Sequence, residues 1–182
     1  ISFLLIYINK KLDIHPILLA FSISLVVFDF LTVNINQLLA HCQVPCGIYN
    51  DAARIVQIEE DIATIKKAMT KISDLAGRTD PQSLNQISRW VTTKEAHAQN
   101  VQETILNYFL AQRIKEKQKG DEGRQKYVDQ TLLLHQLIVA TMKCKQTVDQ
   151  SRCDAALKIV QNFTNSYFDD HGIEHIKSLK KG

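Results

Sequence analysis

The chain has 182 residues, the length of one ordinary domain, and is 45% hydrophobic and 23% charged, as a globular protein is. The net charge of +3 is small, and no basic cluster is interleaved with aromatic side chains, so the composition gives no support to nucleic-acid binding. With only 6 glycines and 3 prolines to interrupt it, the sequence favours long helices over a fold with many turns.

The first forty residues differ from the rest of the chain. They contain four charged side chains, and an apolar run over residues 17–28 follows Lys10 and Lys11. This order is typical of a signal peptide or a short membrane segment, although the run is shorter than the roughly 20 residues of a spanning helix. We expect residues 1–40 to be a leader or targeting segment that is removed, or else sequence that precedes the true start. Residues 41–182 are then the functional domain.

The next nine residues combine an imidazole, two thiols and two residues that favour a turn. They read His41-Cys42-Gln43-Val44-Pro45-Cys46-Gly47-Ile48-Tyr49. Two cysteines at this spacing could bind a metal, act in catalysis or form a disulfide. Both thiolates can face one metal if the chain turns back, and Pro45 and Gly47 allow that turn. Thiolates are soft ligands, and a square-planar set of nitrogen and sulfur atoms suits Ni(II) or Cu(II).

Four stretches after residue 49 have helical periodicity. Their apolar positions recur at steps of three and four: Ile55, Ile58, Ile62, Ile65, Met69, Ile72 and Leu75 in the first; Leu84, Ile87, Val91, Ala98, Val101, Ile105, Tyr108 and Phe109 in the second; Val128, Leu132, Leu134, Leu137, Ile138 and Met142 in the third; Ala156, Ile159, Val160, Phe163 and Tyr167 in the fourth. The pattern predicts an all-α fold, an antiparallel up-and-down four-helix bundle that follows the N-terminal loop of residues 41–49.

Capping residues and glycine also predict where helices begin and end. Asp80 is expected to cap the second helix, with Pro81 at its first position. Ser151-x-x-Asp154 resembles a capping box at the start of the fourth, and Gly172 is expected to break that helix.

The pattern HCxxPCGxY resembles the nickel-binding hook of the nickel-containing superoxide dismutases, with every fixed residue from His41 to Tyr49 at the family's spacing. In that family the hook is the N-terminus of the mature enzyme. The resemblance therefore implies that a peptidase removes residues 1–40. It also implies that a nickel ion is bound by the α-amine and imidazole of His41, the backbone amide of Cys42, and the thiolates of Cys42 and Cys46.

The resemblance implies an enzyme that converts superoxide to dioxygen and hydrogen peroxide while nickel cycles between Ni(II) and Ni(III). His41 would be a catalytic ligand that binds axially when the metal is oxidised. Tyr49 would be the second catalytic residue, standing over the open axial face and restricting access to small anions.

The resemblance covers roughly residues 41–182. The segment Lys94-Glu95-Ala96-His97-Ala98 is similar to a family segment with arginine in place of His97, and that arginine belongs to the hydrogen-bond network around the N-terminal histidine. Glu59 and Glu60 are candidates for the carboxylate that orients the axial imidazole. The family resemblance also suggests a homohexamer, for which aromatic residues at positions 108, 109, 163, 167 and 168 are candidate contacts.

Two other functions remain open on the residues alone. A non-catalytic bundle could hold zinc through Cys42, Cys46, Cys144 and Cys153. A membrane-tethered interaction protein could use residues 41–49 as a linker only. Cys144 and Cys153 flank the expected turn between the third and fourth helices, and we expect them to be reduced in a cytoplasmic protein whose mature domain is not inserted in a membrane.

Overall fold

The computed structural model of the protein describes residues 49–181. Tyr49 is therefore the one hook residue that it describes, and His41, Cys42, Cys46 and the expected leader lie outside the described residues. Between residues 49 and 181 every regular element is a helix. No helix in this range is long and apolar enough to cross a membrane.

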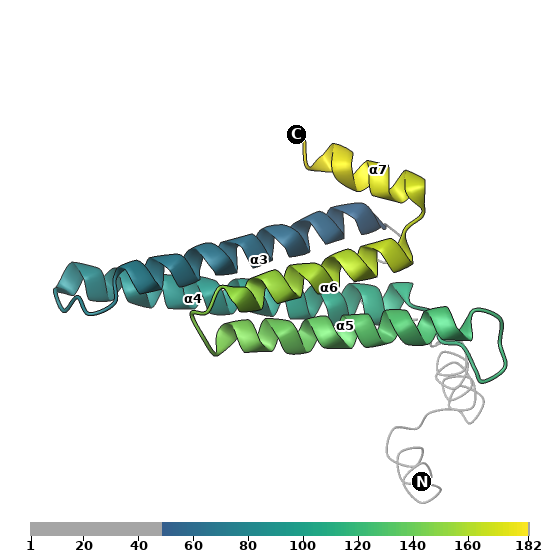
Figure 1. Cartoon of the computed structure of the whole chain (residues 1–182), viewed down its shortest axis with the longest axis horizontal. Helices are drawn as coiled ribbons and strands as arrows, with labels where there is room; N and C mark the ends of the chain where they lie inside the picture. The colour runs from purple at the N-terminus through teal and green to yellow at the C-terminus, as the bar shows by residue number, and fades with distance from the viewer. Residues whose placement is uncertain (1–48, 182) are drawn as a thin grey trace, which may run out of the picture. The chain divides into compact units, whose positions relative to one another are not determined.

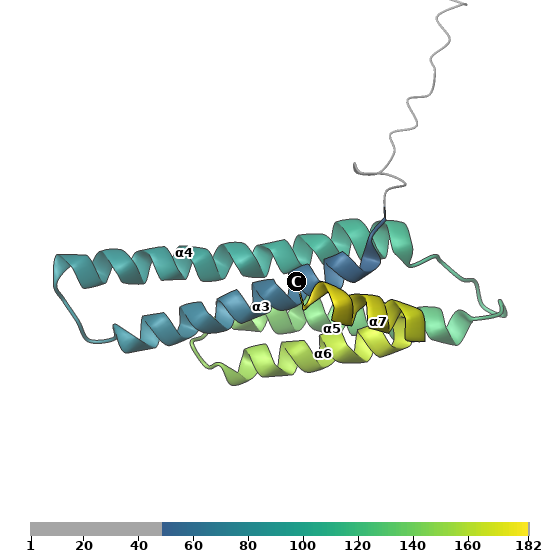
Figure 2. The same cartoon turned by 90° about the horizontal axis from the view of Figure 1, so that it is seen from above.

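Four long helices form the body of the molecule (Figure 1). They are α3 (Asp51–Asp74), α4 (Pro81–Glu103), α5 (Arg124–Lys145) and α6 (Ser151–Tyr167). α3 packs against α4 and α6, and α5 packs against α4 and α6, so the four helices close into a ring around one core. Figure 2 shows the same helices from above, running antiparallel, with a longer connection before α5 than at the other two turns. The predicted antiparallel four-helix bundle is confirmed.

The expected apolar stripe of the first helix forms the centre of the core. Five of its residues are at most 1% exposed: Ile55, Ile58, Ile62, Ile65 and Met69. Their spacing of three and four residues places them on one face of α3, which is the face that the other three helices cover.

The aromatic residues expected at subunit contacts lie instead in the core of this one chain. Phe109 contacts Phe163 and Tyr167 with ring centroids 5.2 and 5.8 Å apart, and Tyr108 contacts Phe109 at 5.2 Å. Phe168 packs against the same cluster. A single bundle therefore covers most of these rings, and they give no reason of their own to expect a second subunit.

The expected cap of α4 is confirmed, whereas the expected capping box of α6 is wrong. Asp80 accepts a hydrogen bond of 2.9 Å from the Ser83 amide, and Pro81 follows it. At α6, the Asp149 carboxylate accepts hydrogen bonds from both the amide and the hydroxyl of Ser151, at 3.0 and 2.8 Å. A carboxylate is the stronger acceptor, so it holds the serine that would otherwise cap the helix.

The break expected at Gly172 occurs earlier, and a further helix follows it. α6 ends at Tyr167, Phe168 is extended, and α7 (Asp170–Leu179) begins after Asp169. The Asp169 carboxylate accepts a hydrogen bond of 2.8 Å from the Gly172 amide, so Gly172 belongs to the first turn of α7. α7 packs on α3, where Ile176 is buried.

Candidate functional site

Tyr49 lies at the end of the bundle where α3 begins, directly before the helix cap. Asn50 caps α3 by accepting a hydrogen bond of 3.0 Å from the Ala53 amide. The Tyr49 ring meets the edge of the Tyr108 ring, with centroids 6.0 Å apart, and the Arg113 guanidinium lies 4.2 Å from its centroid. The side chain is 39% exposed, so one part of the ring faces solvent while the rest is held in place.

Asp51 binds the groups that surround Tyr49. Its carboxylate accepts two hydrogen bonds from Arg113, from Nε at 2.9 Å and from Nη2 at 2.8 Å. It also accepts hydrogen bonds of 2.7 Å from the hydroxyl groups of Tyr108 and Tyr167. A paired guanidinium and two hydroxyl donors satisfy both oxygens of the carboxylate, so α3, α6 and the segment after α4 are tied together at the point where the hook enters the bundle.

The protonation states of this network are fixed around neutral pH. Burial raises the pKa of Asp51, but the hydrogen bonds from Arg113, Tyr108 and Tyr167 outweigh burial and leave that pKa below its usual value. Burial and the hydrogen bond to Asp51 raise the pKa of Tyr167 to about 12, and the same two causes raise the pKa of Tyr108. Asp51 is therefore charged and both tyrosines are hydrogen-bond donors.

The segment that carries Tyr108 and Arg113 is a π-helix, η1 (Thr104–Arg113), which continues α4. In an α-helix, with 3.6 residues per turn, residues five apart point about 140° away from each other. The wider π-helix pairs the amide of residue i+5 with the carbonyl of residue i, as in the 2.8 Å hydrogen bond from the Ile114 amide to the Phe109 carbonyl, and so brings residues five apart closer to one side of the helix. Tyr108 and Arg113 therefore face Asp51 together.

A second polar pair lies further along the bundle, between α3 and α4. His97 Nδ1 lies 2.6 Å from Asp61 Oδ1, and the Asp61 side chain is 1% exposed. The other oxygen, Asp61 Oδ2, has no hydrogen-bond partner among the described residues. Glu59 and Glu60, the candidates for the carboxylate that orients the axial imidazole, do not contact this pair: Glu59 pairs with Lys180 of α7 at 2.5 Å, and Glu60 is exposed. Asp61 is the buried acid beside His97, and its position within an otherwise apolar helix face was the signal for it.

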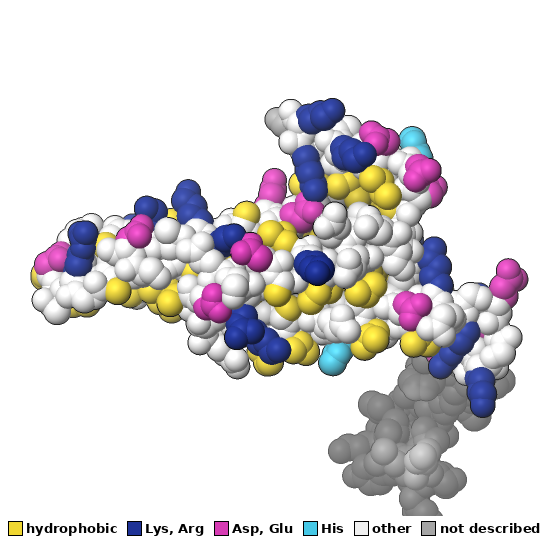
Figure 3. Space-filling view, viewed as in Figure 1, with side chains coloured by type: hydrophobic (Ala, Val, Ile, Leu, Met, Phe, Trp, Pro, Cys, Tyr) yellow, Lys and Arg dark blue, Asp and Glu magenta, His cyan; other side chains and the backbone are white. Residues whose placement is uncertain are grey.

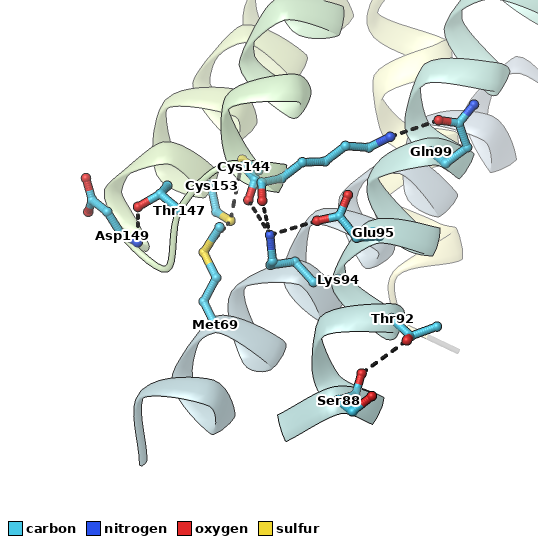
Figure 4. Close-up of polar contacts among 11 residues, drawn as sticks. Met69, Ser88, Thr92, Lys94, Glu95, Gln99, Cys144, Thr147, Asp149 and Cys153 are labelled. Carbon is cyan, nitrogen blue, oxygen red and sulfur yellow. Dashed lines mark hydrogen bonds and ion pairs between the residues drawn. The ribbon is translucent and has the colours of Figure 1, made fainter. Parts of the chain in front are cut away.

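The two remaining cysteines form a separate pair in the core. Cys144 and Cys153 are both fully buried free thiols, with their Sγ atoms 3.8 Å apart (Figure 4). They lie next to Met69 on α3, which is 3.7 Å from Cys153 Sγ.

The cysteine pair and Tyr49, the last residue of the hook, lie at different places along α3. Met69 is 18 residues beyond Asp51 on one helix, a distance of about 27 Å. Cys46 is three residues before Tyr49 and can lie no more than about 11 Å from it. One zinc ion with Zn–S bonds of about 2.3 Å needs its sulfur ligands within about 4.6 Å of each other, so a shared site would require Cys46 to reach the buried pair over most of the length of α3. The described residues therefore give no support to the four-cysteine zinc site.

A donor set for a metal exists in the hook sequence. Between residues 49 and 181 no three His, Cys, Asp or Glu side chains converge on a common point. His41, Cys42 and Cys46 provide an imidazole and two soft thiolates within six positions, and this set of nitrogen and sulfur ligands fits nickel.

Comparison with known proteins agrees with this composition of the hook. The family model described as nickel-containing superoxide dismutase matches residues 36–171, a region that includes the hook and α3 to α6. No curated protein and no solved structure matches the chain.

Proposed function

The chain belongs to the nickel-containing superoxide dismutases, and from this membership we propose which of its residues carry the reaction. It is an oxidoreductase that uses nickel to disproportionate superoxide into dioxygen and hydrogen peroxide. When bound, the ion supplies one-electron chemistry between Ni(II) and Ni(III). The protein must then bind the ion, admit a small anion, exclude larger molecules and deliver protons to the product.

We assign the metal to the hook. Cys42 and Cys46 supply two thiolates, and His41 supplies an α-amine and an imidazole once it is the first residue. The observation that carries this assignment is the family match across residues 36–171, because it places the HCxxPCGxY sequence within the family's own region. A leader over residues 1–40 agrees with the start of that match only five residues before His41.

Tyr49 is suited to controlling access to this site. It follows Cys46 by three residues, so the two Cα atoms lie within about 11 Å of each other. The Tyr49 ring contacts Arg113 and Tyr108, and both of these residues donate hydrogen bonds to Asp51. The position of Tyr49 therefore does not depend on the hook alone. A partly exposed, fixed phenol can order water and limit the size of what reaches the metal.

The Asp61 and His97 pair is suited to orienting the imidazole of His41. Asp61 lies ten residues along α3 from Asp51, about 15 Å. Residues 41–48 can span up to about 28 Å, so a hook that folds back along the bundle can bring His41 to this pair. Asp61 Oδ2 has no partner among the described residues but is buried, so an imidazole N–H reaches it, and is fixed by it, only where the side chains that cover it move aside.

Processing between Ala40 and His41 is the test of this site. An internal His41 nitrogen is an amide and lacks the basic lone pair of an amine, and metal affinity depends on which ligand protons must be lost. We expect the uncut chain to have no appreciable dismutase activity and the form that begins at His41 to be active. Each form is purified, loaded with nickel, and assayed for nickel content and superoxide decay.

Two matched forms sharpen the experiment. A form that begins at Ala40 keeps His41, Cys42 and Cys46 but leaves the His41 nitrogen acylated, and we expect it to be inactive. A form that begins at Cys42 loses both nitrogens of His41 and is also expected to be inactive. Full activity in the uncut chain or in the Ala40 form would mean that another coordination operates.

We also propose a homohexamer and a cytoplasmic location for the mature domain. Membership of the family supports the hexamer. The location is supported by the thiols of Cys144 and Cys153, which are in contact without a bond between them, as a reducing compartment allows.

A further inference from the structure

The thiol pair at the α5–α6 turn has no part in the reaction proposed above. Cys144 is the penultimate residue of α5 and Cys153 is the third residue of α6. The turn between the two helices holds the thiols against each other, and Met69 of α3 completes a cluster of three buried sulfur atoms (Figure 4).

A buried cation lies beside this cluster. Lys94 of α4 is 4% exposed, and its ammonium group donates hydrogen bonds to the carbonyl oxygens of Cys144, at 3.2 Å, and Lys145. It therefore closes the end of α5, where carbonyl groups have no partner within the helix. It also places a positive charge near the Cys144 thiol, in an ion pair with Glu95 at 3.0 Å.

The two thiols differ in acidity. The hydrogen bond from the Cys153 thiol lowers the pKa of Cys144, and the charges of Lys94 and Arg152 lower it further against the effect of burial. The hydrogen bond to Cys144 and burial raise the pKa of Cys153. Cys144 is thus the better nucleophile of the pair, and Cys153 is the neutral partner in contact with it.

We propose that Cys144 and Cys153 are a redox site, which the hydrogen peroxide made by this enzyme oxidises to a disulfide. The Cys144 thiolate attacks one peroxide oxygen, the O–O bond breaks, and hydroxide leaves and takes up a proton as water. This gives a sulfenic acid on Cys144. Cys153 Sγ then attacks the sulfenic sulfur, and a second water leaves with the Cys153 proton. Two thiols lose two electrons and one peroxide gains them.

The geometry favours this product over a sulfenic acid that persists. A sulfur–sulfur bond is about 2.05 Å long, so the two Sγ atoms, now 3.8 Å apart, need to approach by less than 2 Å. Because both thiols are fully buried, peroxide reaches them when the exposed turn over residues 146–150 opens. Oxidation is therefore slow and responds to sustained rather than transient peroxide.

The bond would tie α5 to α6 across a ten-residue loop. Such a cross-link restricts the unfolded chain more than the folded one, so the oxidised protein is the more heat-resistant form. Oxidation of this pair requires that the enzyme produce peroxide, but it does not depend on which hook residues bind the nickel. A wrong ligand assignment would therefore not contradict the disulfide, and the absence of the disulfide would not contradict the ligand assignment.

The experiment uses the full chain with Cys42→Ser and Cys46→Ser, so that only Cys144 and Cys153 can react. Peroxide is added in graded amounts, free thiols are alkylated under denaturing conditions, and the protein is digested with trypsin. Cleavage after Lys143, Lys145 and Arg152 puts the cysteines on different peptides, so mass spectrometry reports a disulfide as one linked species. We expect that species to form, to disappear with reductant, and to raise the melting temperature by about 5 °C.

Single variants test the roles of the two thiols. With Cys153→Ser, peroxide should leave a sulfenic acid on Cys144 that a dimedone probe traps. With Cys144→Ser, trapping on Cys153 should be slower by on the order of tenfold. If a serine variant does not fold, the matching alanine variant, which has no buried hydroxyl, replaces it.

Full alkylation of both cysteines after prolonged peroxide treatment would overturn the proposal. So would sulfinic acid on either residue without linked peptides, or a linkage that joins two molecules rather than one.

Discussion

At the scale of single residues, Asp51 has the largest set of partners at the candidate site. It receives a paired guanidinium and two phenol hydroxyls from residues 57, 62 and 116 positions away in the chain. Its side chain is 14% exposed, so these bonds are only partly screened by solvent. Removing the charge leaves Arg113 without its partner and weakens both tyrosine contacts, and Tyr49 then loses the groups that hold its ring.

Asp51→Asn should reduce the free energy of unfolding by about 2–3 kcal/mol at pH 7, because charged hydrogen bonds to a mostly buried side chain are lost. The pKa of Asp51 is lowered in the folded protein. Its contribution is thus fully present above the unfolded pKa of about 3.9 and is lost as the pH falls through the lower folded pKa. Urea titrations at several pH values should show the gap between wild type and variant closing in acid.

The matched control for Asp51→Asn is Asp74→Asn, at the other end of α3. Asp74 is 55% exposed and pairs with Lys71 at 3.4 Å, so its loss should change stability by less than about 0.5 kcal/mol. An equal loss in both variants would show that the Asp51 network adds nothing beyond an ordinary surface charge.

The network around Asp51 was not visible in the sequence. The hook was visible in the sequence, because its metal-binding residues all lie within nine consecutive positions. Asp51, Tyr108, Arg113 and Tyr167 are ordinary residues in separate segments, and only the fold brings them together. Asp61, which we propose in place of Glu59 and Glu60, is one or two positions further along α3 and was not singled out in the sequence, because acidic residues occupy all three positions and only the fold shows which of them is buried.

At the scale of helices, the sequence predicted the elements whose signal is local and periodic. The four long helices follow from apolar spacing, and Asp80 with Pro81 marks a helix start. The apolar residues of the π-helix η1 show no spacing that would predict its wider turn. Arg113 of η1 contacts Asp51, which is far away in the sequence, so a local pattern cannot predict it. α7 was missed because Gly172 was interpreted as a helix end.

Gly172→Ala should destabilise the protein, against the usual effect of alanine in a helix. Alanine is favoured over glycine by about 1 kcal/mol in a helix interior. Here an added Cβ would lie 2.6 Å from Cδ1 of Phe168, whose ring packs on the core. Overpacking costs about 1–3 kcal/mol, so we expect a net loss of about 1 kcal/mol in the free energy of unfolding and faster hydrogen exchange in α7.

Ser178→Ala, on the exposed side of α7, is the control, and its free energy of unfolding should stay within about 0.5 kcal/mol of wild type. A gain of stability in Gly172→Ala would contradict the close contact with Phe168.

At the scale of the whole molecule, α5 presents apolar side chains that its own bundle does not cover. Val128, Leu132 and Met142 are 37%, 51% and 42% exposed. An apolar groove of about 350 Å³ lies between α5 and α6, with Val139 and Ile159 in its lining. Figure 3 shows hydrophobic side chains gathered along this edge of the bundle between charged ones. If the enzyme is a hexamer, this face is where we expect subunits to meet, because the aromatic residues are already used inside the chain.

Leu132→Glu should therefore separate the subunits of the processed, nickel-loaded protein. A charge on an apolar contact face must be buried without a partner, which opposes association more than folding. Light scattering should give six times the mass of one processed chain for the wild type and a smaller assembly for the variant, while circular dichroism reports unchanged helix. Leu84→Glu is the matched control, since Leu84 is 52% exposed but lies at the start of α4, and its hexamer should persist. A monomeric wild type would exclude the hexamer, and a hexameric Leu132→Glu would place the subunit contacts away from α5.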